Sequence, residues 1–243
     1  MNIIKRLIGY NPYSRPMRKL KGVKGLVVHW IGVPQSRAEV IRNNFENAHG
    51  NYASSHYIID YLSGHIIQAI PEDEVAFHVG ANKYQSWWEA TKLGNPNNYM
   101  VGIECCISDS DKIPVDYANK EKYLDLGKPS TIEYEELAEF CADFLTRHKL
   151  SIDNLYRHYD ITGKPCHLYF YKNEKEWIRF KEYVKSIMDK NNEKNNDEVS
   201  DWAKKAWDWC KERKFLDGTN PKGVVTREMI AQIIYNLFHE DNL

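Results

Sequence analysis

The sequence of 243 residues lacks several features, and each absence excludes a class of protein. It has no apolar run near the roughly 18 residues that a membrane-spanning helix needs, so we expect no membrane span. It has no excess of either charge, with 33 Lys and Arg against 34 Asp and Glu. Because a nucleic-acid-binding protein needs a basic footprint, this balance argues against nucleic acid as a partner. The 42% hydrophobic content is typical of a globular protein rather than a disordered one.

Cysteine is scarce and odd in number. The five cysteines are Cys105, Cys106, Cys141, Cys166 and Cys210. Such an uneven set does not form a disulfide framework, and we expect a reducing compartment in which the thiols stay free. The N-terminus also shows neither the continuous apolar core nor the small-residue cleavage site of a signal peptide. We therefore expect a protein that is made in the cytoplasm and needs another route to act outside a cell.

One stretch without any apolar residue marks a domain boundary. Residues 189–198 (DKNNEKNNDE) are all Asn or charged. Such a segment cannot bury surface, so it is interpreted as a solvated linker. We predict a larger domain over residues 1–188 and a smaller domain over residues 199–243.

The larger domain alternates predicted strands with predicted helices. Four apolar runs are predicted strands, namely residues 25–31, 55–61, 65–70 and 99–107. The second and third of these runs flank a short turn and predict a hairpin. Apolar residues at helical spacing predict three helices, over residues 36–48, 130–148 and 177–187. We assign Ser130 as the N-cap of the second helix. Interleaved strands and helices predict an α/β layer fold.

The smaller domain is predicted to be all-α, with two helices. The apolar stripe of the first helix comprises Trp202, Ala203, Ala206, Trp207 and Cys210. Residues 217–221 (DGTNP) are a dense turn signal, after which Thr226 can cap the second helix. The predicted buried face of that helix comprises Met229, Ile230, Ile233, Ile234, Leu237 and Phe238.

Three residues of the larger domain suit a zinc ion. His29 lies near the end of an apolar strand, whereas His158 and Cys166 share a segment whose Gly163 and Pro165 interrupt a continuous helix. Imidazole and thiolate are both zinc ligands, and two ligands from one loop plus one from a distant strand form a common catalytic layout. The spacing alone is weak evidence, and a hydrogen-bonded core histidine is the usual interpretation of a lone His.

The whole set of motifs resembles a known family, the zinc-dependent N-acetylmuramoyl-L-alanine amidases with the fold of peptidoglycan recognition proteins and phage lysozymes. The matching stretches occur in the family's order over most of residues 20–185: VVHW at 27–30, SSHYIID at 54–60, AFHVG at 76–80, NYMVGIE at 98–104 and HYDITGKPC at 158–166. The resemblance implies a mixed central β-sheet flanked by helices. It also implies one catalytic Zn²⁺ and hydrolysis of the amide between N-acetylmuramic acid and L-alanine in peptidoglycan.

The resemblance implies roles for single residues as well. His29, His158 and Cys166 match the three zinc ligands of the family. Glu104 matches the acidic residue that many bacterial and phage members use as the general base. Lys164 matches a residue that stabilises the transition state. Because a site with one thiolate and two neutral imidazoles is a weaker Lewis acid than a three-histidine site, a carboxylate base is also chemically reasonable.

Four further residues are expected to contact the substrate. His56 and His78 match frequent wall positions of the family's active site. Where some members have a catalytic tyrosine just before the first of these histidines, this chain has Ser55, so no tyrosine role is expected there. Trp87 and Trp88 lie in a polar stretch and are expected either to stack on sugar rings or the stem peptide, or to cover the core.

The smaller domain resembles a single S-layer-homology repeat. The resemblance rests on Trp202-Ala203, Asp217-Gly218-Thr219 and Val225-Thr226-Arg227-Glu228. Such modules commonly bind secondary cell-wall polymers of Gram-positive bacteria and usually occur in threes. The resemblance implies a wall polymer as a partner, with Arg227 and Trp202 as wall contacts. With one copy, we expect either weak binding by the single module or self-association through this domain that supplies avidity.

Together these resemblances imply a phage or prophage endolysin that lyses Gram-positive, in particular clostridial, cell walls. It would stay in the host cytoplasm until a holin-type pore releases it to the wall. A bacterial autolysin, which would need another route out of the cell, is also compatible with the resemblance. One alternative is a non-catalytic peptidoglycan-binding protein of the same fold, and another is a structural wall-anchored protein. A third alternative uses Cys105 or Cys106 as a thiol nucleophile, although their apolar strand favours buried, unreactive cysteines.

Overall fold

The computed structural model describes residues 1–32, 36–106, 128–171, 173–197, 199–213, 215–216, 221–223 and 225–238; of residues 192–197 and 236–238 it describes the backbone alone. The chain divides into two compact units, Met1–Met188 and Asp189–Leu243. None of the helices in the described part of the chain is long and apolar enough to cross a membrane.

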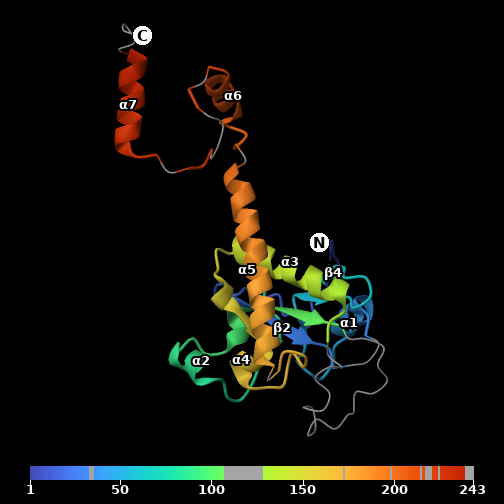
Figure 1. The fold of residues 1–243 in the computed structure, drawn as a ribbon. Helices are drawn as coiled ribbons and strands as arrows, with labels where there is room; N and C mark the ends of the chain where they lie inside the picture. Colours follow the sequence, from blue (N-terminus) through green and yellow to red (C-terminus); the bar gives the residue numbers. More distant parts are fainter. Residues whose placement is uncertain are drawn as a thin grey trace. The chain divides into compact units, whose positions relative to one another are not determined.

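A mixed sheet forms the centre of the first unit (Figure 1). Its strands are β1 (Ile3–Lys5), β2 (Gly25–Trp30), β3 (Tyr57–Ile59), β4 (Ile66–Gln68), β5 (Met100–Cys105) and β6 (Leu155–Arg157), in the order β1-β4-β3-β5-β2-β6. β3 and β4 form the predicted antiparallel hairpin, and the other neighbouring pairs are parallel. The hairpin turn includes Gly64 at a φ of 67°, a backbone conformation that favours glycine. The prediction of strands in the four apolar runs is confirmed, except that Ile107 lies outside the described residues.

Helices cover both faces of this sheet. They are α1 (Ala38–Glu46), α2 (Ser86–Ala90), α3 (Thr131–Arg147), α4 (His158–Thr162) and α5 (Glu174–Asp197), with short 3₁₀ turns at Pro96–Asn98 and Ile152–Asn154. On one face, side chains such as Leu26 and Ile103 pack against α3 and α5 in the largest core cluster. On the other face, α1 packs on Ile58, and side chains of α2 and α4 pack on Val27. Because strand side chains alternate between faces, the residues next to Leu26 and Ile103 point toward the second face.

One predicted helix, over residues 130–148, agrees with the structure at its N-cap, and another, over residues 36–48, buries only some of its apolar side chains. The N-cap assignment of Ser130 is confirmed, since its Oγ accepts the backbone N–H of Glu133 at 3.2 Å. In α1, however, Val40 is exposed whereas Ile41 and Phe45 are buried. Val40 lies about 100° around the helix from Ile41 and so points away from the sheet.

The segment that composition marks as a linker is helical as far as Asp197. α5 begins at Glu174, buries Trp177 and Val184 in the core, and continues past the boundary between the two units. Helix propagation fixes one residue per added hydrogen bond, so polar residues can extend a helix whose first turns are already held by packing. Residue 198 lies outside the described part of the chain.

The second unit contains α6 (Lys204–Glu212) and α7 (Arg227–Phe238), as predicted. The predicted burial of the apolar face of α7 is wrong for the four described side chains of that face. About half of each is exposed, and they are Met229, Ile230, Ile233 and Ile234. A unit of two short helices is too small to cover such a face by itself. The side chains of Leu237 and Phe238 and the turn at residues 217–220 lie outside the described residues.

Candidate metal centre

Sheet register brings His29 and Glu104 together. β2 and β5 are parallel neighbours, and His29 is the register partner of Glu104. Register partners in a sheet project to the same face. Both side chains line a cleft of about 560 Å³, which His158, Lys164 and Cys166 also line. The structure therefore brings together all five residues for which the sequence predicts a metal-binding or catalytic role.

Local structure after β6 positions the second and third candidate ligands, His158 and Cys166. His158 is the first residue of α4, directly after Arg157 of β6. Arg157 fixes this turn, since its backbone N–H and its guanidinium both donate to the carboxylate of Asp160. Gly163 then ends α4 at a φ of 76°, where glycine is favoured. The chain returns so that the backbone N–H of Tyr159 donates to the carbonyl of Cys166 at 2.7 Å.

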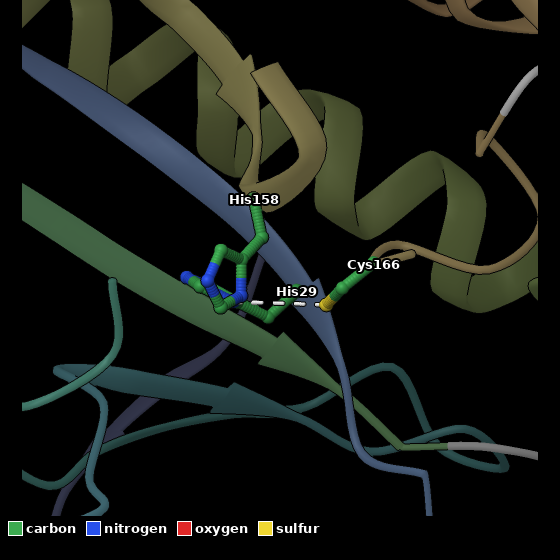
Figure 2. A group of neighbouring side chains, drawn as sticks. All are labelled: His29, His158 and Cys166. Atoms are coloured by element: carbon green, nitrogen blue, oxygen red, sulfur yellow. Dashed lines mark hydrogen bonds between the residues drawn. The ribbon is translucent and has the colours of Figure 1, made fainter. Parts of the chain in front are cut away.

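The three candidate ligand side chains point toward one another (Figure 2). His29 Nδ1 lies 3.1 Å from His158 Nδ1 and 3.9 Å from Cys166 Sγ. A tetrahedral zinc with bonds of about 2.0 to 2.3 Å would place two nitrogens about 3.3 Å apart and a nitrogen and a sulfur about 3.6 Å apart. The observed separations therefore fit one zinc ion bound by these three atoms.

Burial gives the site the right protonation state for a cation. His29, His158 and Cys166 are all buried. Burial, together with the positive charge of Lys164 and neighbouring imidazoles, holds the pKa of His29 well below its usual range. Burial and Lys164 likewise lower the pKa of His158 to about 3. Both imidazoles are thus neutral at pH 7, and two neutral imidazoles with one thiol form a donor set that suits Zn²⁺.

Glu104 has the properties of a proton acceptor rather than of a surface glutamate. Its Oε2 is buried and has no hydrogen-bond partner among the described residues. Burial raises the pKa of Glu104 to about 7, although the positive charge of Lys164 opposes this rise. A buried carboxylate oxygen without a partner is costly for stability, so its position in an open cleft points to a role with water or substrate.

The two remaining histidines predicted at the site have different surroundings. His78 lines the cleft and its Nδ1 lies 2.9 Å from His29 Nε2. His56 is fully buried and does not line the cleft. Its Nε2 lies 2.8 Å from the carbonyl of Glu74, and its Nδ1 accepts the backbone N–H of Gly102 at 3.0 Å. His56 therefore supports the wall of the site from behind.

The structure does not bring the two tryptophans to the cleft. Trp88 is buried, and its indole N–H donates to the carbonyl of Gly94 at 2.7 Å. Trp87 stacks on Tyr156 with ring centroids 5.0 Å apart and donates to the carbonyl of Asp160 at 2.7 Å. Of the two roles expected from the sequence, Trp88 matches the covering of the core. Trp87 is exposed, and its hydrogen bond to Asp160 braces the short helix that begins at His158.

Several cleft residues were not anticipated from the sequence. Aromatic side chains line part of the cleft, and they are Trp30, Phe45, Tyr52 and Phe77. Asn95 and Asn97 also line it. Trp30 directly follows His29, and Phe77 directly precedes His78. This position next to a motif histidine was the available signal for both. Tyr52 lies outside the matching motifs, and nothing in the sequence marked it.

The thiol-nucleophile alternative finds no support at Cys105 or Cys106. Both are buried, and neither lines the cleft. Burial raises the pKa of Cys105 well above its usual value, and burial likewise raises the pKa of Cys106. Both therefore remain protonated and unreactive.

In the second unit, Arg227 begins α7 and Trp202 precedes α6, and both side chains are exposed.

A comparison with known families agrees with this geometry. The family model described as N-acetylmuramoyl-L-alanine amidase matches residues 18–167, a range that includes His29, Glu104, His158 and Cys166. The chain belongs to this amidase family.

Curated relatives carry the same family name. A probable N-acetylmuramoyl-L-alanine amidase of Bacillus licheniformis is 31% identical over 195 residues, which are 77% of this chain and 48% of the relative. The amidase BlyA of Bacillus subtilis strain 168 is 32% identical over 194 residues, 74% of this chain and 46% of the relative. The chain thus spans about half the length of these relatives.

Solved structures show the same fold. The structure of PlyL matches with a TM-score of 0.55 at 21% identity, over 76% of this chain and 97% of that chain. The catalytic domain of XlyA matches with a TM-score of 0.55 at 18% identity, over 76% of this chain and 99% of that chain. The predicted mixed sheet flanked by helices is therefore confirmed, both by the coordinates and by these neighbours.

Proposed function

We propose that this chain is a zinc-dependent amidase that hydrolyses the bond between N-acetylmuramic acid and L-alanine in peptidoglycan. The observation that carries the proposal is the convergence of His29, His158 and Cys166 in a cleft that Glu104 and Lys164 also line. Membership of the amidase family supports the same reaction. The curated relatives described above are also named for it.

The residues of the cleft supply the proton transfers and the charge stabilisation. When bound, Zn²⁺ supplies a Lewis acid that polarises the amide carbonyl and makes water more acidic. The carboxylate of Glu104 accepts the proton of the attacking water, and a pKa of about 7 lets the same carboxyl return it to the leaving amine of L-alanine. The ammonium of Lys164 stabilises the negative charge that develops on the carbonyl oxygen.

The wall of the cleft suits a ligand with both sugar and peptide parts. Trp30, Tyr52 and Phe77 offer aromatic surface on which an apolar sugar face can pack. Asn95 provides an amide that can hydrogen-bond to polar groups of a peptide. This combination of stacking surface and neutral hydrogen-bonding groups supports a glycopeptide substrate.

The experiment that tests the proposal is cleavage of purified muramoyl-peptide fragments followed by mass spectrometry of the products. The expected products are the intact peptide with a free L-alanine amine and the released muramic acid sugar. The matched control is the Cys166→Ser variant, which keeps the shape of the cleft but loses one ligand. Cleavage between two sugars instead of at the amide to L-alanine, or equal cleavage by the variant, would contradict the proposal.

The exposed surface of the second unit supports a role as a targeting domain. We propose that this unit binds a secondary cell-wall polymer through Arg227 and Trp202, since a guanidinium binds anionic groups and an exposed indole stacks on sugars. Sedimentation of the full chain with Gram-positive walls tests it, with Arg227→Ala expected to weaken binding. Unchanged binding by this variant would exclude Arg227 as a contact.

The apolar face of α7 supports self-association of the second unit. Met229, Ile230, Ile233 and Ile234 form a face that is about half exposed within a single chain. Large exposed apolar patches mark interaction sites, and two copies of this face can cover each other. Joining two wall-binding units would raise the avidity for the wall.

A lytic role follows from these activities together. We propose that the chain is a phage or prophage endolysin for Gram-positive, in particular clostridial, walls, held in the host cytoplasm until a holin-type pore releases it. The alternative of a binding protein that does not cut is less well supported, because the three ligands, Glu104 and Lys164 are all retained in one cleft.

A further inference from the structure

We propose that His78 is a positioning residue that holds His29 in the ring orientation and tautomer that bind the metal. The inference rests on the proposed zinc site. His29 presents Nδ1 to His158 and Cys166, and its other nitrogen, Nε2, lies 2.9 Å from His78 Nδ1. The two rings meet edge to face, with centroids 5.1 Å apart.

A backbone carbonyl determines where the protons lie. His78 Nε2 lies 3.0 Å from the carbonyl oxygen of Met100. A carbonyl oxygen can only accept a hydrogen bond, so Nε2 of His78 carries the proton. In a neutral imidazole Nδ1 is then an acceptor, and the short contact to His29 requires His29 to donate from Nε2. His29 Nδ1 is therefore left with a free lone pair directed at the metal position.

Burial keeps His78 neutral, as this arrangement requires. The ring is buried, and the nearest rings are the uncharged imidazoles of His29 and His56. Moving a charged imidazolium out of water is unfavourable, and the two ring nitrogens of His78 contact only an imidazole and a backbone carbonyl, neither of which carries a charge that would offset this cost. A neutral ring can act as an acceptor at Nδ1 and a donor at Nε2 at the same time.

Surrounding residues fix the position of His78 independently of the metal. Asn97 Oδ1 accepts the backbone N–H groups of His78 at 3.0 Å and Val79 at 2.8 Å. Gly102 of β5 lies under the ring, where a Cβ atom would come within 2.6 Å of His78 Nδ1. The ring can therefore occupy this place only above a glycine.

His56 closes the arrangement from behind. Its ring meets that of His78 edge to face, with centroids 5.6 Å apart. Its Nε2 lies 2.8 Å from the carbonyl of Glu74, so Nε2 is the donor, and its Nδ1 accepts the backbone N–H of Gly102. The carbonyls of Met100 and Glu74 thus fix the tautomers of His78 and His56. His78 in turn orients His29.

Two variants separate the hydrogen bond from the space that His78 fills. His78→Phe keeps a ring of similar size but has no acceptor, whereas His78→Asn places an oxygen near the position of Nδ1. Partners that orient a metal ligand typically change metal affinity by about 10–100-fold. We expect zinc affinity of the full chain, measured by competition with a chromophoric chelator, to fall by about that factor in His78→Phe and to recover largely in His78→Asn.

The unfolding temperature of the metal-free variants serves as the structural control. A merely structural role would lower this temperature without producing the difference in zinc affinity between Phe and Asn. Wild-type zinc affinity in His78→Phe, or an equal loss in both folded variants, would overturn the proposal. Because the readout is zinc binding, it remains informative even if the chain binds zinc but does not cleave peptidoglycan.

A second measurement needs no variant. Long-range ¹H–¹⁵N spectra of the ¹⁵N-labelled full chain report which ring nitrogen of each histidine carries the proton. We expect the Nε2–H tautomer for both His29 and His78 in the metal-free protein, and the same tautomers after zinc is added. A proton on Nδ1 of His78 would overturn the proposal whether or not the chain binds zinc.

Discussion

His29 and Glu104 lie side by side, in register, on the neighbouring strands β2 and β5, and both side chains line the same cleft. Parallel strands are held about 4.8 Å apart by backbone hydrogen bonds. A proposed metal ligand and a proposed proton acceptor are thus held at a nearly fixed separation by the backbone pairing of two central strands. His158 and Cys166 complete the site from a turn that begins directly after β6, the other neighbour of β2.

Replacing Cys166 by serine should abolish tight zinc binding and lysis while leaving the fold intact. A hydroxyl is of similar size to a thiol, so packing is conserved, but it is a much poorer zinc ligand than a thiolate. Zinc content of the purified protein and its far-ultraviolet circular dichroism measure the two effects separately. Normal zinc content together with full lysis would remove Cys166 from the site.

Replacing Glu104 by glutamine should leave zinc bound and reduce turnover by about 10²–10⁴-fold, the usual contribution of a general base. Glutamine keeps the shape of the side chain but cannot take up the proton. Since the change also replaces a buried group whose ionisation is disfavoured by a neutral amide, we expect stability to be equal or higher at and above neutral pH. Zinc content, turnover and thermal unfolding are the measurements. A turnover close to that of the wild type would place the base elsewhere.

Acid stability should depend on Glu72. Burial opposes its ionisation, but hydrogen bonds from Arg147, His148 and Tyr57 prevail and lower its pKa from 4.5 to about 2. A carboxyl whose pKa is lower in the folded state contributes stability above pH 4.5, and this contribution is lost as the pH falls toward 2. Because Glu72 is only partly buried, solvent screens its ion pairs, and we expect its contribution to the free energy of unfolding to be well below the roughly 3 kcal/mol that the full shift would give.

Urea unfolding at pH values from 7 down to 2 measures this dependence. The variant Glu72→Gln should be less stable at pH 7 and should lose less stability on acidification than the wild type. The neighbouring variant Asp73→Asn is the matched control, because the Asp73 side chain is mostly exposed and should contribute little. Parallel pH curves for the wild type and Glu72→Gln would refute the assignment.

The exposed face of α7 should make the full chain associate in a concentration-dependent way. Introducing a charge by Ile233→Asp should shift the protein toward the monomer in sedimentation velocity, since a charge in a covered apolar interface is strongly unfavourable. Gln232→Asp adds the same charge to the same helix, away from that face, and should change little. A strictly monomeric wild type at high concentration would show that self-association does not occur.

The sequence predicted the elements that are specified by a local pattern of apolar and turn residues. β2 and β5 are buried on both faces, so their residues are nearly all apolar, and the hairpin of β3 and β4 has a glycine at its turn. The site residues followed from motifs in which several polar side chains recur in a fixed order. The strand prediction is confirmed by the observed sheet, whereas the motifs bring five residues into one cleft and their roles stay predictions.

What the sequence could not predict depends on contacts with distant groups. His56 was expected at the wall, but its ring turns toward the carbonyl of Glu74, which no pattern around His56 reveals. Trp88 lies in a polar stretch, yet its indole finds a partner in the carbonyl of Gly94 and is buried. The sequence predicted a buried face for α7, because periodicity shows that a face is apolar but not what covers it.

The most direct test of the central claim is product analysis on purified Gram-positive cell walls. New free amino termini and new reducing sugar ends are followed with the native protein, after treatment with a chelator, and after zinc is restored. We expect L-alanine amino termini to appear without reducing ends, to be lost with the chelator and to return with zinc. New reducing ends, or release of amino termini that persists in the zinc-free protein, would contradict a zinc-dependent amidase.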